Sequence, residues 1–227
     1  MNSSSSPSRP HIVVIDPAIN IAETKCFNFL ALQSPIPCTY HLPAMYGLQS
    51  LAAEDMRDAK GIIVLGSASS VNERAPWQSQ LEGWLKPHLE HRIPTLGLCY
   101  GHQMLAHMFG GQVDYIFPDQ RKHKGLREIK IHATPWSEAT VGRLVVSHGE
   151  AVVKAPASMR VIGKSAEIET DGFAHIDLPI WSFQSHPEAT LEFLSSHEIA
   201  LTGGLHDLVF GHDLMQRFLR FAAKSVR

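Results

Sequence analysis

The sequence predicts an α/β fold, with a mostly parallel central sheet flanked by helices and an antiparallel, strand-rich second half. Two observations predict it. Up to about residue 111, short and fully apolar runs alternate with longer runs of helical periodicity, which is typical of a parallel sheet covered on both faces. Beyond that residue, short strand-like runs follow one another with only turn residues between them. We therefore expect two halves that differ in strand direction.

The first half holds several strand candidates, each a short apolar run bounded by turn residues. They cover residues 11–16, 37–41, 62–65 and 94–98. Helical spacing of apolar residues predicts the intervening helices at residues 19–32, 48–56, 77–90 and 103–109. A ligand of such a sheet sits beyond the carboxyl ends of the strands. The small-residue loop at 66–70 and Cys99 both follow strands, so we expect them on one rim.

The second half is predicted to contain a series of short strands and two closing helices. The strand candidates are residues 112–116, 125–133, 143–147, 160–167, 172–176 and 180–183. Helical periodicity marks residues 191–200 and 205–223. Because neither a repeat nor a long linker occurs, residues 11–227 are interpreted as a single domain. Residues 1–10 are rich in Ser and Pro, and they are interpreted as a disordered tail rather than a signal peptide.

The composition narrows the class of protein. A formal net charge of −2 over 227 residues gives no basic field for a nucleic acid, and no apolar run reaches the length of a membrane span. The three cysteines lack zinc-type spacing, which fits free thiols in a reducing cytoplasm and predicts no metal site. Cys26 and Cys38 are interpreted as buried or incidental. No P-loop or other ATP signature occurs, and no cofactor is expected.

A cysteine occupies the apex of the predicted strand, turn and helix at residues 94–109. The segment Gly97-Leu98-Cys99-Tyr100-Gly101 has the form G-x-C-x-G, the cysteine version of a nucleophile elbow. Glycines on both sides allow a tight turn because they carry no Cβ. The thiol would lie above a helix N-terminus, where free N–H groups and the helix dipole favour the thiolate. The pattern predicts that Cys99 is a nucleophile.

A nucleophilic cysteine needs a base and a group that orients the base. His186 follows the strand candidate at 180–183, and Glu188 comes shortly after it. The Glu188 carboxylate could accept a hydrogen bond from one ring nitrogen of His186 and leave the other facing the thiol. Attack on an amide also needs N–H donors for the oxyanion. The N–H of Tyr100 and the loop Gly66-Ser67-Ala68 are the candidates.

Two segments together resemble the class I, triad-type glutamine amidotransferases. They are Gly97-Leu98-Cys99-Tyr100-Gly101-His102-Gln103 and Phe183-Gln184-Ser185-His186-Pro187-Glu188-Ala189, in the order of that family. The Gly-containing loop after an earlier strand matches as well, and Ser70-Val71-Asn72-Glu73 is similar to the stand-alone, GMP-synthase-like branch. The resemblance spans residues 12–194 and implies a flavodoxin-like glutamine amidotransferase fold.

The resemblance implies a role for each matching residue. Cys99 would attack the glutamine side-chain amide, His186 would act as general base and then acid, and Glu188 would orient His186. Ser67 and Tyr100 would supply the oxyanion-hole N–H groups. The implied substrate-binding residues are Gly66, Gln103, Ser147, His148 and Gly149, the last three within residues 146–151. The residues alone leave packing roles open for His148 at a strand end and for His102 at the helix start.

One departure concerns the loop before the elbow. Family members commonly have Gly-Gly-Pro where this chain has Gly66-Ser67-Ala68. Serine adopts some glycine geometries only at a cost of about 1 kcal/mol or more. The oxyanion hole is therefore expected to differ in shape, or to form only with a substrate or partner present.

Three functions remain open on these residues. The first is a cysteine-dependent amidohydrolase that releases ammonia from glutamine through a cysteinyl thioester, with any acceptor reaction on a separate synthetase or acceptor subunit. The second applies the same triad to a γ-glutamyl peptide or conjugate, and a wide pocket above Cys99 would favour it. The third is a non-catalytic, partner-binding subunit, supported only by the altered loop. The expected ligand is glutamine or another γ-glutamyl small molecule, with neither nucleic acid nor membrane as partner.

Overall fold

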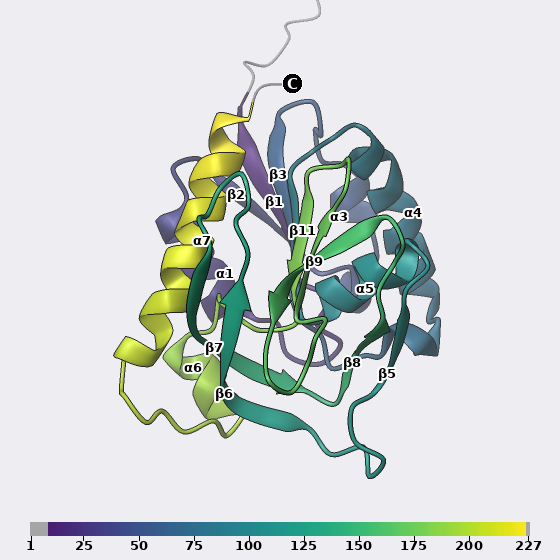
Figure 1. The fold of residues 1–227 in the computed structure, drawn as a ribbon. Coiled ribbons are helices and arrows are strands. Elements are labelled where there is room, and N and C mark those ends of the chain that lie inside the picture. Colours follow the sequence, from purple (N-terminus) through teal and green to yellow (C-terminus); the bar gives the residue numbers. More distant parts are fainter. Residues whose placement is uncertain (1–8, 226–227) are drawn as a thin grey trace, which may run out of the picture.

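The computed structural model describes residues 9–225, and most of its strands form one nine-stranded sheet (Figure 1). In chain order these strands are β1 (His11–Ile15), β2 (Cys38–His41), β3 (Ala59–Val64), β4 (Thr95–Leu98), β6 (His123–Ile131), β7 (Thr140–His148), β9 (Met159–Lys164), β10 (Gly172–His175) and β11 (Ile180–Phe183). Their order across the sheet is β2-β1-β3-β4-β11-β10-β9-β6-β7. A separate two-stranded sheet pairs β5 (Gln112–Tyr115) with β8 (Glu150–Lys154). Residues 1–8 of the predicted tail lie outside the described residues.

The strand directions confirm the predicted change of character along the chain. The five strands β2, β1, β3, β4 and β11 run parallel. β10, β9, β6 and β7 extend the same sheet through antiparallel pairs. β11 pairs with β4 although it comes much later in the sequence, and Phe183 lies opposite Leu98. This pairing brings the segment that follows β11 to the end of β4, where Cys99 begins the next turn.

Helices cover both faces of the parallel part of the sheet (Figure 1). α1 (Thr24–Gln33) and α7 (His206–Lys224) pack on one face, and α4 (Pro76–Glu90) and α5 (Tyr100–Met108) pack on the other. The shorter elements are α2 (Pro43–Tyr46), α3 (Gln49–Ala52), α6 (Leu191–Ser196) and the 3₁₀ turn η1 (Val71–Glu73). The predicted α/β architecture with flanking helices is therefore confirmed.

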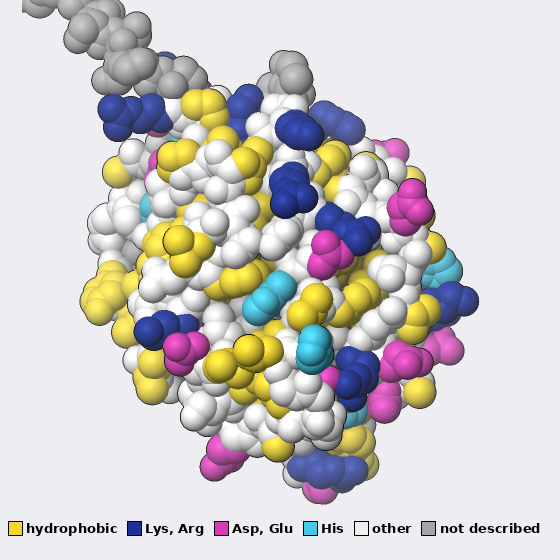
Figure 2. Space-filling view, turned by 90° about the vertical axis from the view of Figure 1, so that its left-hand side faces the viewer, with side chains coloured by type: hydrophobic (Ala, Val, Ile, Leu, Met, Phe, Trp, Pro, Cys, Tyr) yellow, Lys and Arg dark blue, Asp and Glu magenta, His cyan; other side chains and the backbone are white. Residues whose placement is uncertain are grey.

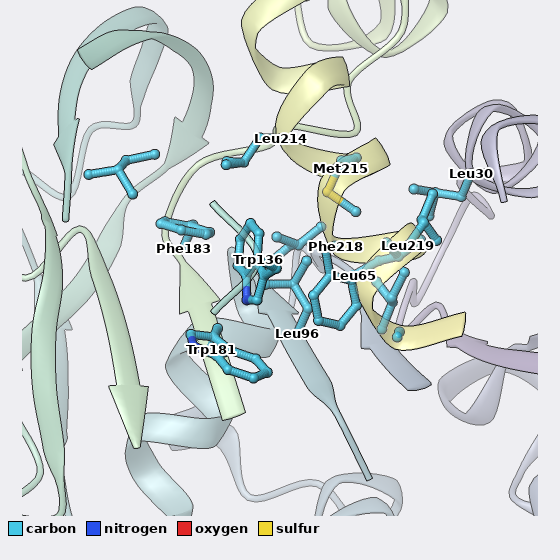
Figure 3. Close-up of a cluster of buried hydrophobic side chains, with 14 of the residues drawn as sticks. Leu30, Leu65, Leu96, Trp136, Trp181, Phe183, Leu214, Met215, Phe218 and Leu219 are labelled. Carbon is cyan, nitrogen blue, oxygen red and sulfur yellow. The ribbon is translucent and has the colours of Figure 1, made fainter. Parts of the chain in front are cut away.

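Alternation along β1 divides the core into two layers. Ile12 and Val14 belong to the layer under α7, whereas Val13 and Ile15 belong to the layer under α4 and α5, and all four are fully buried. Figure 3 shows the layer under α7, where side chains of that helix pack against side chains of the central strands. Its members include Leu96, Trp136, Trp181, Phe183, Leu214, Met215, Phe218 and Leu219. This packing holds β4 and β11 together beside the elbow.

Helix α1 begins at Thr24, so the predicted start at residue 19 is wrong. The cause is Asp16, directly after β1, whose buried carboxylate accepts hydrogen bonds from the N–H groups of Ala18 (3.0 Å) and Glu23 (2.7 Å). These bonds compete with the first turn of a helix and hold the intervening residues as a loop. That loop borders the cleft described below.

Other predicted bounds also need correction. The helix predicted at 48–56 is only the short α3, because the Glu54 carboxylate turns to His11 and His41, 3.0 Å from each ring. The helix predicted at 191–200 ends at Ser196, since Glu198 has φ = 56°, outside the right-handed helical region.

Two strands differ as well. The strand predicted at 160–167 ends at Lys164, because the Ser165 hydroxyl accepts the N–H of Ile168 at 3.0 Å in a turn. β8 was not predicted as a strand, since only Gly149 separates it from β7 and no cluster of turn residues marks its start.

On the face shown in Figure 2, hydrophobic side chains form small groups separated by polar and charged ones. Within residues 9–225, no helix has both the length and the apolar character to cross a membrane.

Candidate active site

Cys99 occupies the turn between β4 and α5 with φ = 50° and ψ = −100°. A non-glycine residue held at positive φ costs about 1–3 kcal/mol, so its surroundings must enforce the conformation. The Cys99 N–H donates to the carbonyl of Phe183 at 2.9 Å, and its own carbonyl accepts the N–H of Gln103 at 3.1 Å. The first bond ties the turn to β11, and the second begins α5. The thiol therefore lies at a helix N-terminus, as the sequence pattern predicts.

The two glycines of the elbow are required by close packing. A Cβ on Gly97 would lie 2.5 Å from the carbonyl oxygen of Gly101. A Cβ on Gly101 would collide with the backbone of Val64 in β3. Helix α5 thus starts directly against the strands, and any side chain at either position would push Cys99 out of place.

His186 lies in the loop after β11, where its N–H donates to the carbonyl of Val145 in β7 at 2.8 Å. The ring Nδ1 is 2.9 Å from Oε1 of Glu188, and the two side chains are only 5 % and 2 % exposed. A carboxylate only accepts hydrogen bonds, so Nδ1 carries the hydrogen that it donates to Glu188. The other ring nitrogen, Nε2, is then left for the thiol side.

The pKa of His186 is raised well above the usual value for histidine. Burial by itself lowers that pKa, because the imidazolium loses its hydration. The negative charges of Cys99 and Glu188 raise it by more than burial lowers it. This arrangement favours the charged imidazolium of His186, which can donate a proton beside the sulfur.

Gly66 brings the loop after β3 against both reactive side chains. A Cβ at this position would lie 2.7 Å from Cε1 of His186 and 3.5 Å from the Cβ of Cys99. Cys99 and His186 therefore flank the same point of the loop. A side chain at residue 66 would meet the imidazole before it met the thiol.

Gln184 adds a hydrogen bond to the thiol that the sequence analysis did not predict. Its Nε2 lies 3.7 Å from Sγ of Cys99. Its Oε1 accepts from Nε2 of Gln103 at 3.2 Å, and that same Nε2 donates to the carbonyl of Glu150 at 2.8 Å. Because a backbone carbonyl only accepts, the Gln103 atom that contacts it is the amide nitrogen. This fixes the orientation of the Gln103 carboxamide and, through the bond between them, that of the Gln184 carboxamide. The amide hydrogens of Gln184 therefore favour negative charge on the sulfur.

A buried ion pair lies beneath this network. Arg127 pairs with Asp171, and its other terminal nitrogen is 3.1 Å from Nε2 of His148. Because arginine only donates, Nδ1 of His148 carries the hydrogen and donates to the carbonyl of Glu150 at 2.9 Å. Burial, followed by the Arg127 charge, lowers the pKa of His148 to about 3, so the ring is uncharged. The Asp171 carbonyl accepts the N–H of Gln184 at 2.8 Å, which links this pair to the thiol.

The expected strain at Ser67 is absent. Among residues 9–225, Ser67 is not one of the non-glycine residues with positive φ, so its backbone carries no left-handed strain. The expectation that the oxyanion hole differs in shape, or forms only with a substrate or partner, stays a prediction. Its hydroxyl donates to the Pro17 carbonyl at 2.7 Å and accepts the N–H of Ser69 at 3.1 Å. The loop is therefore tied to the segment after β1. The ring of Tyr100 packs beside Trp77, 5.7 Å between centres, so Tyr100 offers the site its backbone.

Two hollows meet at Cys99 and form one cleft. Both are lined by Ser67, Ala68, Cys99, Lys122 and Ser147. The first, here called the Gln103 branch, is completed by Ser69, Ser70, Glu73, Gln103, Tyr115, Gln120, His148, Gly149 and Glu150. The second, here called the Glu23 branch, is completed by Ala18, Ile19, Asn20, Ile21, Glu23, Gly66, His186, Glu188, Phe193, Ser196 and His197.

The predicted site residues thus converge from distant parts of the chain, and all but Tyr100 line this cleft. His102 lies outside it: its Nδ1 is 2.9 Å from the Ser182 hydroxyl, and its ring stacks on Phe173. Sequence reasoning missed Glu23, which fell inside a wrongly extended helix. It also missed Gln184, although this residue belongs to the same short segment as His186.

The sequence and the fold of this chain are similar to those of several known proteins. The model of the glutamine amidotransferase class-I family matches residues 41–200. A glutamine-hydrolysing GMP synthase of Wolinella succinogenes is 33 % identical over 147 residues, 62 % of this chain and 27 % of that protein. One subunit of the glutamine-hydrolysing GMP synthase of Methanopyrus kandleri is 31 % identical over 138 residues, 60 % of this chain and 70 % of that protein. A solved glutamine amidotransferase of Thermotoga maritima has a TM-score of 0.74 at 16 % identity, over 96 % of this chain and 99 % of that one.

The chain belongs to the class I glutamine amidotransferase family. Its α/β fold, with a curled mixed sheet between helices, matches that of the Thermotoga maritima structure. The matched part spans 27 % of the length of the Wolinella succinogenes GMP synthase.

Proposed function

We propose that the protein hydrolyses the side-chain amide of glutamine through a thioester on Cys99. The observation that carries this proposal is the buried cluster of Cys99, His186 and Glu188, with the cysteine held at positive φ on a helix N-terminus. Membership of the class I glutamine amidotransferase family supports glutamine as the substrate. The convergence of the remaining predicted residues on one cleft supports the same reaction.

Acylation starts from the Cys99 thiolate. The sulfur attacks the amide carbon of the glutamine side chain, and the carbonyl electrons move onto oxygen. The N–H groups of Ser67 and Tyr100 are the proposed donors to that oxyanion, and one such donor contributes about 3 kcal/mol in enzymes of this kind. His186 then transfers its Nε2 proton to the departing nitrogen. The C–N bond breaks, ammonia leaves, and a thioester remains on Cys99.

Deacylation uses the now neutral His186 as a base. It takes a proton from water while the water oxygen attacks the thioester carbon. The C–S bond breaks, which restores the thiolate and the imidazolium, and the acid formed loses its proton to solvent as glutamate. Glu188 keeps Nδ1 oriented through both steps, and Gln184 lowers the cost of the charge on sulfur each time it appears.

We propose that the amino-acid end of glutamine binds in the Gln103 branch. Two carboxylates, Glu73 and Glu150, line this branch and would attract the α-ammonium group. The Ser147 hydroxyl is buried and lacks a hydrogen-bond partner among the described residues. A bound ligand would satisfy it.

The fate of the ammonia is assigned by analogy. The Methanopyrus kandleri relative is by name one subunit of a glutamine-hydrolysing GMP synthase. We infer that a separate synthetase or acceptor subunit uses the ammonia that this chain releases.

The test is release of ammonia and glutamate from glutamine by purified protein. Cys99→Ala is expected to lose at least about 1000-fold in kcat/KM, because no other group can carry the acyl intermediate. Cys38→Ala is the matched control, since this half-buried thiol on β2 lies outside the cleft, and it should keep the wild-type rate. Undiminished release by Cys99→Ala would sink the proposal. A folded wild type without any activity would instead support the non-catalytic, partner-binding function.

A further inference from the structure

The two branches of the cleft meet at Cys99, and beyond the wall that they share each is lined by different residues of the proposed site. His186 and Glu188 line only the Glu23 branch, whereas Gln103, His148, Gly149 and Glu150 line only the Gln103 branch. The nitrogen that leaves must receive its proton from His186, so it has to lie on the His186 side of the thiol. Given the proposed function, the γ-glutamyl half of a substrate then occupies the Gln103 branch. The Glu23 branch is left for whatever is attached to the departing nitrogen.

The Glu23 branch is far larger than ammonia requires. Its cavity measures about 230 Å³, whereas a site for one water-sized molecule needs only roughly 10–15 Å³. Besides the predicted catalytic residues, its walls include the loop after β1 and part of α6, two segments that carry none of those residues. An ammonia leaving group would fill only a small part of this space.

The walls of this branch combine apolar and acidic character. Ile19, Ile21 and Phe193 supply the apolar surface. Glu23 supplies a carboxylate that has no Lys, Arg or His nitrogen within 4 Å among the described residues. The thiol of Cys26, 3.8 Å away, is its weak hydrogen-bond donor.

Other groups around Glu23 make its surroundings more negative. Burial, followed by the charges of Asp16 and Glu188, raises the pKa of Glu23 to about 7. The second oxygen of Glu188 is buried without a hydrogen-bond partner among residues 9–225. His197 adds no positive charge, because burial lowers its pKa. His186 in the same branch carries a positive charge that lowers the pKa of Glu23, but by less than burial, Asp16 and Glu188 raise it. Lys122, the other cation, is exposed and lines both branches, so it stands at the shared opening.

We propose that the Glu23 branch binds the amine half of γ-glutamyl amides, and that Glu23 selects amines with an apolar stem and a terminal ammonium group. The structure thus extends the proposed glutaminase reaction to a class of substrates in which the γ-glutamyl group is joined to a larger amine. The same bonds break and form as in the proposed reaction with glutamine. His186 protonates the amine nitrogen, the C–N bond breaks, the free diamine leaves through the Glu23 branch, and water converts the thioester to glutamate.

The test compares glutamine, which has no amine substituent, with three amides whose amine halves each contain four carbons. These are γ-glutamylputrescine, γ-glutamylbutylamine and γ-glutamyl-4-aminobutyrate, whose amine halves end in an ammonium group, a methyl group and a carboxylate. Glutamate release is measured at pH 8, where the Glu23 carboxyl is mostly ionised. The wild type should prefer the ammonium probe over the carboxylate probe by about tenfold or more in kcat/KM, or roughly 1.4 kcal/mol.

Two variants separate the role of Glu23 from a general charge effect. Glu23→Gln keeps the shape of the side chain and should abolish most of this preference. Glu192→Gln removes the same charge from an exposed position on α6 outside the branch, and it should leave the preference intact.

Each result decides the proposal. Loss of the preference in Glu23→Gln but not in Glu192→Gln supports it. Hydrolysis of glutamine but of none of the three amides overturns it while leaving the glutaminase function in place. Cleavage of the amides without preference, or with a preference that Glu23→Gln does not change, also overturns it. Failure to hydrolyse any of the four probes overturns the proposed function itself.

Discussion

Substitution of Gly66 by alanine tests whether the loop after β3 sets the position of the His186 imidazole, the proposed base. The added Cβ would lie 2.7 Å from Cε1 of His186, and favourable carbon–carbon contacts begin at about 3.5 Å. His186 is held on its other sides by Glu188 and by its backbone bond to Val145. The imidazole must therefore shift by roughly 0.5–1 Å, or the loop must withdraw by the same amount.

The expected cost is mainly catalytic. A misplacement of about 1 Å lowers turnover by as much as about 100-fold, so Gly66→Ala should lose roughly 10- to 100-fold in kcat/KM for glutamine. Overpacking one methyl group should destabilise the fold by about 1–3 kcal/mol, which leaves the protein folded at room temperature.

Gly83→Ala on α4 is the matched control. No atom beyond the neighbouring backbone of its own helix lies within 4 Å of the Cβ that it would add, and alanine is the better helix former by about 0.5–1 kcal/mol. It should therefore keep full activity and unfold at a slightly higher denaturant concentration. Both variants are assayed by ammonia release and by urea denaturation. Wild-type kcat/KM in Gly66→Ala would refute the inferred contact with His186.

Three further predictions concern charges near the site. Glu188→Gln removes one of the two negative charges that raise the pKa of His186, so the imidazolium should lose its proton at a lower pH. The high-pH limb of the kcat/KM profile should therefore move toward lower pH. An unmoved limb would contradict the pairing of His186 with Glu188. The folded chain holds a proton on Glu23 up to about pH 7, whereas an ordinary glutamate releases it near 4.5, so stability falls as pH rises through that window. Glu23→Gln should then be more stable than the wild type at pH 8 by about 1–2 kcal/mol, a figure discounted because Glu23 is partly exposed. The difference in stability should vanish near pH 4. Equal urea midpoints of the two proteins at pH 8 would contradict the raised pKa of Glu23. Arg127→Leu leaves Asp171 buried without its partner and should lower the free energy of unfolding by about 3–5 kcal/mol. Arg127→Leu combined with Asp171→Leu should lower it by less. If the loss in the double variant equals the sum of the losses in both single variants, the two residues have no pairing energy.

The elbow could be predicted from sequence because its determinants are local. The apolar run, the glycines at 97 and 101 and the helical spacing behind them lie within a few residues of Cys99. The same holds for His186 and Glu188, which share one short segment. Their meeting with Cys99 depends on the parallel pairing of β4 with β11, which the resemblance implied and local patterns alone did not.

The residues that sequence reasoning missed act through contacts distant in sequence. Arg127 and Asp171 pair across the antiparallel part of the sheet, and no local pattern identifies either as the partner of the other. The contact of Gln184 with the thiol depends on the orientation of its carboxamide, which the hydrogen bonds among Gln184, Gln103 and Glu150 determine. The loop ending at Glu23 was assigned to a helix, because apolar spacing cannot reveal that Asp16 binds the N–H groups that would start it.

Serine at position 67 has a role that its sequence position alone did not reveal. The Ser67 hydroxyl ties the loop to Pro17, and its backbone carries no left-handed strain. Whether this loop forms an oxyanion hole of altered shape stays a prediction.

Labelling with a glutamine-shaped electrophile tests the role of Cys99 most directly. The protein is treated with a diazoketone analogue of glutamine at low concentration, with and without glutamine as competitor, and the modified residue is located by peptide mass spectrometry. The chain has three free cysteines, so selectivity is measured within one molecule. A single adduct on Cys99, slowed by glutamine and by Glu188→Gln, is the predicted result. Labelling spread over Cys26 and Cys38, or an unmodified Cys99, would contradict the assignment of Cys99 as the glutamine-directed nucleophile.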